Sequence, residues 1–372
     1  MKIAVLTSSR ADYGIYLPLL KGLKKDPLYD LNIIAFGTHL KKNFGYTIDQ
    51  IVNDGFEIAY KIDNLLEGDS PKDISDSYAN TILKFSDFWS KNNDFDWVLC
   101  LGDRFEMAAA VNAGIPFQIK FAHIHAGETT LGAIDNIYRH QITLASSLHF
   151  VSLPEYADKV HQLIGHKETI EIIGSLSLLN LELLNLLSID DFREKWNIDL
   201  NLPTILVTAH PETVQFNENE KYAIELKKAL IDLAENYQIV VTLPNADTNG
   251  AIFRKMFFEL GSQYDTVKLI ENFGTLSYFS CMKWAKLLIG NTSSGIIEAA
   301  SFNKYVINLG NRQAGRIAPE NVLNVPFDSK KITETAEKYI QNTYFGNNPY
   351  FQKNSIEMIL ERLITNALNI KL

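Results

Sequence analysis

The chain has 372 residues, a net charge of −9 at pH 7 and an isoelectric point near 5.5. This acidic balance argues against nucleic acid or a membrane surface as the partner, although it allows a local cationic pocket for an anionic small molecule. Because apolar residues make up 46% of the chain and charged residues 21%, the composition is that of an ordinary globular protein. A chain of this length exceeds what one hydrophobic core usually supports, so we expect two domains.

The cysteines and the longest apolar runs indicate where the protein works. Cys100 and Cys281 lie inside apolar runs, which predicts buried thiols in a reducing compartment and no disulfide framework. The apolar run after Met1 is too short for a signal peptide. The leucine-rich stretch Leu176–Leu187 is interrupted by polar residues and falls short of the ~20 apolar residues of a membrane span, so we expect a buried or interdomain helix. These features predict a cytoplasmic protein.

In the first half of the chain, short apolar runs alternate with stretches of helical spacing. The runs are bounded by Gly, Asp or Ser, and this alternation is typical of βαβ units with a parallel sheet. The predicted strands are Lys2–Thr7, Leu31–Phe36, Trp97–Leu101, Ile119–His123 and Leu148–Ser152, and the predicted helices are Ile15–Lys25, Ser75–Lys91, Phe105–Ala113 and Asp135–Ala145.

The same pattern restarts after a changeover between Gly174 and Pro203. The stretch Glu218–Glu235 carries one apolar stripe at helical spacing. The second set of predicted strands is Thr204–Ala209, Ile239–Leu243, Val267–Ile270, Leu287–Ile289 and Tyr305–Leu309.

These patterns predict an α/β protein of two Rossmann-like domains with parallel sheets facing across a cleft. We expect residues 1–178 plus 352–372 to form the first domain, because an amphipathic helix at about Tyr350–Ile370 could fold back onto it. Residues 179–351 would form the second domain. Ligands in such folds bind at the carboxyl ends of the strands.

A turn of small residues at Gly290–Glu298 follows a predicted strand and leads into helical spacing. Such a turn presents unpaired backbone N–H groups and a positive dipole end to an anion. Ordinary helix capping uses the same chemistry, so both interpretations stay open. The stretch is not a Walker motif, because no Gly-Lys-Ser/Thr follows. The candidate binding groups are the close-approach glycines Gly290 and Gly295 and the hydroxyls of Thr292, Ser293 and Ser294.

Charged residues follow the predicted strands of the first half. Arg10 and Asp12 come after the first strand and could clamp a phosphate, although Asp12 could equally cap a helix. Asp103 and Arg104 follow a later strand, either as part of a site or as a structural salt bridge. We favour a site in both cases because the planar guanidinium suits anion recognition.

A His-x-His pair, His123 and His125, ends another predicted strand. The pair would face one way if the strand ran through it, which raises a metal site. No further His or Cys stands at ligand spacing, so we expect no metal. Glu128 and Asp135 are better candidates for acid–base work, because a cleft can shift one carboxyl toward neutrality.

Polar residues also follow the strands of the second half. His210 stands in a turn after a strand, and Asn245 and Asp247 end the next strand in the same way. Arg312 and Arg316 lie in the loop after Tyr305–Leu309. Two guanidiniums beside a Ser-rich turn suit a diphosphate better than a simple anion.

With these residues assembled, the chain resembles the hydrolysing UDP-N-acetylglucosamine 2-epimerases, which supply N-acetylmannosamine for bacterial sialic acid synthesis. The resemblance covers nearly the whole chain and implies a GT-B-like fold with UDP held mainly by the second domain. The matching motifs are Ser9–Gly14, Gly102–Arg104, His123–Glu128, Asp135, Arg139–His140, His210–Thr213, Asn245–Asp247, Gly290–Gly295 and Arg312–Arg316.

The resemblance also implies residue roles. Thr292, Ser293 and Ser294 would hold the phosphates, while Glu298 would bind the ribose. Arg312 would bind the uridine side and Arg10 the diphosphate. The reacting sugar would be lined by Asp103, Glu128, Asp135 and His210.

Two positions depart from relatives. Some relatives have Glu at the place of His125, with an acid–base role, so either His125 or Glu128 would serve here, and Ala126 replaces a frequent Gly.

The chemistry implied is elimination of UDP to a 2-acetamidoglucal, followed by addition of water, without a cofactor. Relatives suggest a homodimer or homotetramer. One alternative keeps the reaction and changes the substrate to a UDP-2,4-diacetamido-2,4,6-trideoxyhexose of legionaminic acid synthesis. Others are a GT-B glycosyltransferase, which would need an acceptor, and a silent nucleotide-sugar sensor, which would gain little from carboxylates near a diphosphate.

Overall fold

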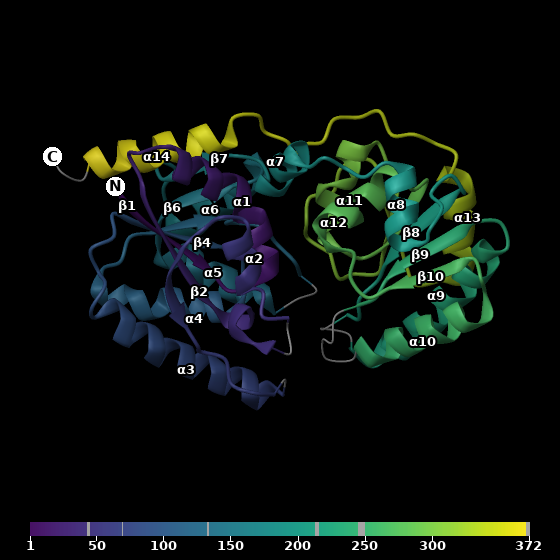
Figure 1. The fold of residues 1–372 in the computed structure, drawn as a ribbon, viewed down its shortest axis with the longest axis horizontal. Coiled ribbons are helices and arrows are strands. Elements are labelled where there is room, and N and C mark those ends of the chain that lie inside the picture. Colours follow the sequence, from purple (N-terminus) through teal and green to yellow (C-terminus); the bar gives the residue numbers. More distant parts are fainter. Residues whose placement is uncertain (43–44, 69, 132–133, 213–215, 245–249, 370–372) are drawn as a thin grey trace. The chain divides into compact units, whose positions relative to one another are not determined.

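The computed structural model describes residues 1–42, 45–68, 70–131, 134–212, 216–244 and 250–369. The chain divides into two compact units, and each is an α/β unit built on one parallel sheet (Figure 1). Unit 1 comprises Met1–Glu128, Asp135–Asn180 and Tyr350–Leu372, and unit 2 comprises Thr129–Ile134 and Leu181–Pro349.

Unit 1 contains seven parallel strands in the order β3-β2-β1-β4-β5-β6-β7. The order reverses direction between β1 and β4, which is the switch point where such sheets bind ligands. The strands are β1 (Lys2–Thr7), β2 (Asp30–Phe36), β3 (Ile58–Ile62), β4 (Trp97–Leu101), β5 (Phe121–Ile124), β6 (Ser146–Val151) and β7 (Ile170–Ile172).

Both faces of this sheet are covered by helices, so its strands are apolar on both sides. Ile3 and Val5 of β1 pack with residues of α1, α2 and α14, while Ala4 and Leu6 pack with residues of α3, α4 and α5. The helices are α1 (Arg10–Lys25), α2 (Ile48–Asn53), α3 (Pro71–Trp89), α4 (Phe105–Gly114), α5 (Asp135–Ala145), α6 (Pro154–Ile164), α7 (Leu176–Leu183) and α14 (Ser355–Asn369), with short 3₁₀ turns η1 (Gly37–Leu40) and η3 (Ile115–Phe117).

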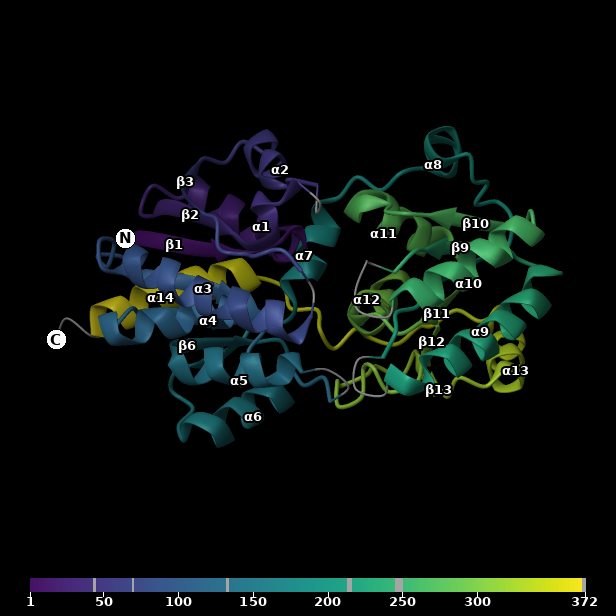
Figure 2. The ribbon, with the colours of Figure 1, turned by 90° about the horizontal axis from the view of Figure 1, so that it is seen from below.

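Unit 2 contains six parallel strands in the order β10-β9-β8-β11-β12-β13, with its switch point between β8 and β11. Figure 2 shows α9 and α10 running along this sheet. The strands are β8 (Thr204–Thr208), β9 (Gln238–Thr242), β10 (Val267–Ile270), β11 (Leu287–Gly290), β12 (Val306–Leu309) and β13 (Val322–Val325). The helices are α8 (Ile189–Trp196), α9 (Asn219–Ala234), α10 (Gly250–Gln263), α11 (Gly274–Trp284), α12 (Ser293–Ile297) and α13 (Ser329–Tyr339), with 3₁₀ turns η4 (Phe216–Glu218) and η5 (Ala299–Phe302).

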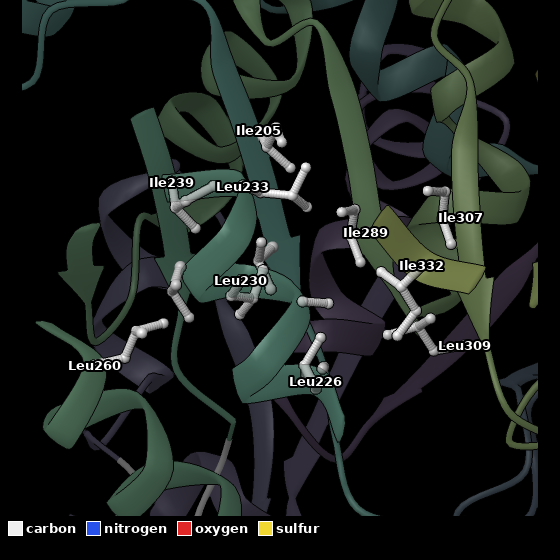
Figure 3. Packing of buried hydrophobic residues seen from close by; sticks show 14 of the residues in the cluster. Ile205, Leu226, Leu230, Leu233, Ile239, Leu260, Ile289, Ile307, Leu309 and Ile332 are labelled. Carbon is white, nitrogen blue, oxygen red and sulfur yellow. The ribbon is translucent and has the colours of Figure 1, made fainter. Parts of the chain in front are cut away.

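A hydrophobic core of unit 2 lies between its sheet and helices α9, α10 and α13 (Figure 3). Leu226, Leu230 and Leu233 recur at helical spacing on α9 and meet Ile205 and Ile289 of the strands. Burying one such side chain stabilises the fold by about 1.5–3 kcal/mol. This packing fixes the strand ends that carry the polar residues of unit 2.

The chain leaves unit 1 within α7 and returns to it at Tyr350. The carbonyl of Tyr350 accepts a hydrogen bond from the backbone N–H of Ser175 at 2.8 Å. Helix α14 then packs on unit 1, where the indole Nε1 of Trp97 donates to the carbonyl of Leu363 at 3.1 Å. The last helix of the sequence therefore completes the core of the first unit.

The α/β class with two Rossmann-like units, predicted from the alternation, is confirmed. Three strands were not predicted, namely β3, β7 and β13. Each lies at an edge of its sheet, so none is buried along its whole length. Within the described ranges, no helix combines the length and apolarity that crossing a membrane requires.

Candidate active site

The predicted site residues of unit 1 follow neighbouring strands. Arg10 follows β1, Asp103 follows β4, and His125 and Glu128 follow β5. Because all strands are parallel, these residues gather at the carboxyl edge of the sheet, around the switch point. The fold thus brings together groups that lie more than a hundred residues apart in the sequence.

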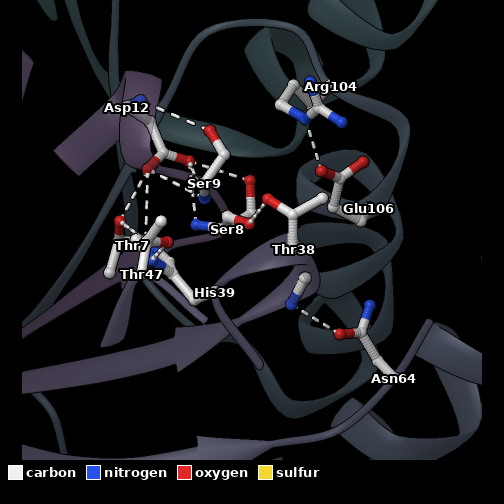
Figure 4. Close-up of polar contacts among 11 residues, drawn as sticks. Thr7, Ser8, Ser9, Asp12, Thr38, His39, Thr47, Asn64, Arg104 and Glu106 are labelled. Atoms are coloured by element: carbon white, nitrogen blue, oxygen red, sulfur yellow. Dashed lines mark hydrogen bonds and ion pairs between the residues drawn. The ribbon is translucent and has the colours of Figure 1, made fainter. Parts of the chain in front are cut away.

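Asp12 holds the turn that carries Arg10 (Figure 4). Its carboxylate accepts hydrogen bonds from the Thr7 hydroxyl at 2.6 Å and from the N–H and hydroxyl of Ser8, both at 2.8 Å. Ser9 is the N-cap of α1 and completes a capping box with Asp12. Arg10 is exposed at the first helical position. These contacts give Asp12 a structural role, which is one of the two interpretations that the sequence left open.

A buried histidine extends this network. His39 contacts the Thr7 hydroxyl through Nε2 at 2.9 Å and the Thr47 hydroxyl through Nδ1 at 2.8 Å (Figure 4). Burial lowers the pKa of His39, although the nearby carboxylate of Asp12 opposes this effect. The contacts among Asp12, Thr7, His39 and Thr47 thus hold the turn between β1 and α1 in place.

Asp103 and Arg104, which follow β4, each pair with another residue. Asp103 accepts a hydrogen bond from Nη2 of Arg139, which is 3% exposed and donates through Nη1 to the carbonyl of His125 at 2.7 Å. Arg104 is the N-cap residue of α4 and pairs through Nε with buried Glu106. Arg139, on α5, therefore ties the loops after β4 and β5 together.

The two histidines after β5 have different surroundings. Strand β5 ends at Ile124, so His125 lies beyond it. His123 is fully buried, with Nε2 on the carbonyl of Gly102 at 2.9 Å, and burial holds its pKa well below the usual range. His125 contacts Oε1 of Glu128 through Nδ1 at 2.9 Å. His123 is thus a structural residue, while His125 and Glu128 form a pair.

Asp135 begins α5 and has an environment that disfavours its charge. Burial and the neighbouring carboxylate of Asp103 raise the pKa of Asp135, although Arg104 and Arg139 partly offset them. Two carboxyl groups with different environments are the arrangement that separates an acid from a base.

In unit 2, Asn291 connects the ends of β8 and β11. Its amide Oδ1 accepts from the backbone N–H of His210 at 2.8 Å, and its Nδ2 donates to the His210 carbonyl at 2.9 Å. Burial, followed by the charge of Arg312, lowers the pKa of His210 to about 3. Nδ1 of His210 is buried without a hydrogen-bond partner among the described residues. The imidazole is therefore neutral at physiological pH.

The loop after β12 brings Arg312 to the same place. Nη1 of Arg312 and Nε2 of Gln313 both donate to the carbonyl of Asn291, at 3.3 and 3.0 Å. Arg316 donates through Nε to Oε1 of Gln313 at 3.1 Å. His210, Arg312 and Arg316 are thus gathered around Asn291 and Gln313 at the carboxyl edge of the sheet.

The Ser/Thr turn precedes α12, a helix of only five residues. Thr292 is its N-cap and lies 2.9 Å from the hydroxyl of Ser294, which in turn lies 2.7 Å from the hydroxyl of Tyr278. Ser293 is exposed, while Gly295 and Glu298 are buried. The turn therefore combines the predicted capping with one outward hydroxyl, that of Ser293.

Two residues of the unit 2 site had no predicted role, and two predicted site residues lie outside the described residues. Asn291 and Gln313 lie inside matched motifs but received no predicted role of their own, yet they hold the unit 2 site together. Asn245 and Asp247 lie outside the described residues. Among the described residues, no group of three or more His, Cys, Asp or Glu is placed to hold a metal ion.

Solved structures define the class of fold. A UDP-GlcNAc 2-epimerase from Neisseria meningitidis bound to UDP-GlcNAc matches with a TM-score of 0.83 at 20% identity, covering 98% of this chain and 100% of that one. A complex of MnaA from S. aureus with UDP matches with a TM-score of 0.81 at 19% identity, covering 99% and 97%. The protein therefore has the GT-B-like architecture of two Rossmann-like domains.

Sequence comparisons identify the family. The model of the UDP-N-acetylglucosamine 2-epimerase family matches residues 21–364. A GDP/UDP-N,N'-diacetylbacillosamine 2-epimerase (hydrolyzing) from Campylobacter jejuni is 34% identical over 87% of this chain and 84% of its own length. The polysialic acid biosynthesis protein P7 from Escherichia coli is 33% identical over 95% and 91%. The chain belongs to the UDP-N-acetylglucosamine 2-epimerase family, as its motifs predicted.

Proposed function

We propose that this protein is a hydrolysing 2-epimerase that converts a UDP-linked 2-acetamido sugar and water into UDP and the free 2-epimeric sugar. The observation that carries the proposal is the cluster of His125, Glu128, Asp103 and Asp135 at one sheet edge, in a chain of this family. Hydrolysis, rather than epimerisation alone, is supported by two relatives whose names include it.

Unit 2 would hold the nucleotide. Arg312, beside the neutral imidazole of His210, and the outward hydroxyl of Ser293 are donors for a diphosphate. Charge grows on that diphosphate as its bond to the sugar breaks, so fixed cationic donors would stabilise the transition state more than the bound substrate. Arg10, exposed on α1, would supply a further guanidinium. Glu298 would accept from the ribose hydroxyls.

Unit 1 would move protons at carbon 2 of the sugar. A base removes that proton while UDP leaves carbon 1, and water then adds across the double bond with its hydroxyl on carbon 1. Inversion at carbon 2 requires that the proton leaves one face and arrives on the other, so two separate groups are needed. The pair His125–Glu128 and the carboxyl of Asp135, whose pKa is raised, supply two such groups.

Two sugars are candidates for the substrate. UDP-N-acetylglucosamine, leading to N-acetylmannosamine and sialic acid, is the substrate that the motifs predicted first. The UDP-2,4-diacetamido-2,4,6-trideoxyhexose is favoured by two diacetylbacillosamine epimerases at 34% and 33% identity. The same residues would act on either, since both carry an acetamido group at carbon 2.

A UDP-release assay with each sugar, without any acceptor, tests the function and selects the substrate. We expect stoichiometric UDP and free 2-epimeric sugar from one of the two. If both UDP-sugars remained intact and an added acceptor became glycosylated, the chain would be a glycosyltransferase and the proposal would be wrong.

A further inference from the structure

His125 combines an unusual backbone conformation with an unusual side-chain environment. Its φ is 63°, in the left-handed region, which costs a residue with a side chain about 1–3 kcal/mol. The conformation is held by the hydrogen bond from Nη1 of Arg139 to the His125 carbonyl at 2.7 Å. Such strain persists where surrounding structure fixes it, and it is often found at functional sites.

The ring of His125 is buried, and among the described residues one partner contacts it. Its exposed fraction is 6%, and Nδ1 lies 2.9 Å from Oε1 of Glu128, which is 2% exposed and also accepts from the Ser152 hydroxyl at 3.1 Å. Nε2 of His125 has no hydrogen-bond partner in the described part of the chain. Leaving a buried ring nitrogen without a partner costs about 1–3 kcal/mol.

Other buried histidines of unit 1 show what a purely structural imidazole looks like here. His39 contacts the hydroxyls of two threonines, one on each ring nitrogen. His123 contacts the Gly102 carbonyl and the Thr143 hydroxyl, at 2.9 and 3.1 Å. His149 contacts the Thr143 carbonyl through Nε2 at 2.9 Å, with a longer contact at Nδ1. In these three histidines both ring nitrogens have a partner, whereas in His125 Nδ1 has one and Nε2 has none among the described residues.

We propose that His125 is the base of the elimination step and that Glu128 is a positioning residue that acts through it; this inference rests on the proposed function. A carboxylate that accepts from Nδ1–H fixes the tautomer, which leaves the lone pair on Nε2 as the proton acceptor. The sequence could not choose between the two residues, whereas the contact geometry gives each a separate role.

The step balances without a further reactant. The bond between carbon 2 and its hydrogen breaks and the proton goes to Nε2 of His125. The released electron pair forms the double bond between carbons 1 and 2, and the electrons of the bond from carbon 1 to oxygen leave with UDP. The imidazolium then gives its proton to water. In the hydration that follows, a different acid protonates carbon 2 on the opposite face, and water supplies the hydroxyl at carbon 1 and releases a proton.

Separate assays of the two half-reactions test this assignment in the full-length protein. The elimination is followed as UDP release from the sugar that the wild type uses. The hydration is followed as free sugar formed from the corresponding 2-acetamidoglycal supplied with UDP. For His125→Gln we expect UDP release to fall by roughly 10²–10⁴-fold with KM nearly unchanged. Hydration of the supplied glycal should stay within a few-fold of the wild-type rate, and so should both activities of the surface control His166→Gln.

Two further measurements separate proton transfer from mere structural support. Added imidazole should restore UDP release to His125→Ala, because the small base can enter the vacated space. Glu128→Gln should lower kcat more than it changes KM, and the double variant His125→Gln/Glu128→Gln should be no slower than His125→Gln alone, because residues that act as a unit are not additive.

The outcomes that overturn this assignment differ from those that overturn the function. Near-normal UDP release by His125→Gln, equal loss of both half-reactions in a folded variant, or no rescue by imidazole would each remove His125 as the elimination base while leaving the epimerase function intact. A wild type that releases no UDP from either sugar would remove the function and this role together.

Discussion

At the scale of single residues, Asp135 combines a structural cost with a proposed chemical role. Burial and the nearby carboxylate of Asp103 raise its pKa, so the folded protein is less stable when Asp135 is ionised than when it is neutral. Since the folded-state pKa is raised, this cost is present at neutral pH and is relieved as the pH falls.

Asp135→Asn should therefore raise the thermal midpoint at neutral pH while lowering turnover by roughly 10²–10⁴-fold. The reason is that an amide removes the buried charge together with the group that carries the proton. Calorimetry and the UDP-release assay measure the two effects, with exposed Asp232→Asn as the control. A lower midpoint than that of the control would contradict the pKa argument.

For His210, the dependence of folding stability on pH has the opposite sign. Its pKa falls from the ordinary 6.5 to about 3, first through burial and then through Arg312. Between these values the unfolded chain binds a proton that the folded chain does not, so acidification favours unfolding. The stability that the neutral ring contributes is present above pH 6.5 and is lost as the pH falls toward about 3.

We therefore expect the free energy of unfolding to fall less steeply in His210→Gln than in the wild type over this pH interval. Urea titrations of both proteins at a series of pH values give the comparison. The difference between them isolates His210 from the carboxylates that also titrate there. Parallel curves for the two proteins would show that His210 is not held neutral by its surroundings.

Individual residues also show which features of the site could be predicted from the sequence. The positions of Arg10, Asp103 and His210 close after a strand could be predicted, because each comes within three residues of the end of an apolar run. The role of Asp12 could not, because the same residue at the same position serves either as a cap or as a ligand, and only the contacts separate the two.

At the scale of elements, the end of β11 allows no side chain. Gly290 has φ of 155°, and a Cβ there would collide with the carbonyl oxygen of Thr208 on the paired strand β8. Relieving the collision would separate the two strands at the switch point. The requirement for glycine at this position therefore comes from strand pairing.

Gly290→Ala should destabilise the protein by more than about 2 kcal/mol, because the paired backbones of β8 and β11 would have to move apart. Gly14→Ala is a matched control in α1, where an added Cβ meets nothing within 4 Å and should stabilise the helix by about 0.5–1 kcal/mol. Denaturant unfolding measures both. Equal stability of the two variants would show that β8 and β11 are not paired as described.

Some element boundaries followed directly from the sequence. Residues Lys2–Thr7, Trp97–Leu101 and Val267–Ile270 are strands with the predicted bounds, because an apolar run between polar residues defines both ends. Strand β3 alternates half-buried with exposed residues, and only the two end residues of β13 are buried, so no continuous buried run predicts either strand.

At the scale of the whole molecule, the assignment of chain segments to the two units is the feature that is hardest to predict from the sequence. Six residues, Thr129–Ile134, between β5 and α5 belong to unit 2, where the backbone N–H of Leu131 donates to the carbonyl of Ala314 at 2.8 Å. No periodicity or composition change marks this short segment, since its assignment depends on contacts with residues far away in the sequence.

The return of the chain to unit 1 gives a prediction about stability. Leu363 on α14 is fully buried in the core of unit 1, so Leu363→Ala should destabilise that unit by about 2–5 kcal/mol. The exposed neighbour Glu361 provides the control variant Glu361→Ala. Hydrogen exchange of the unit 1 strands reports the change. Unaltered protection in Leu363→Ala would mean that α14 is not part of this core.

Proton NMR of the wild type in heavy water tests the central claim, hydrolysis with inversion at carbon 2, most directly. With the UDP-sugar that is consumed, the account predicts free UDP and a released 2-epimeric sugar that carries deuterium at carbon 2, because the proton removed in the elimination is replaced from solvent. A released sugar that keeps its original hydrogen at carbon 2, or an epimerised sugar still attached to UDP, would contradict it.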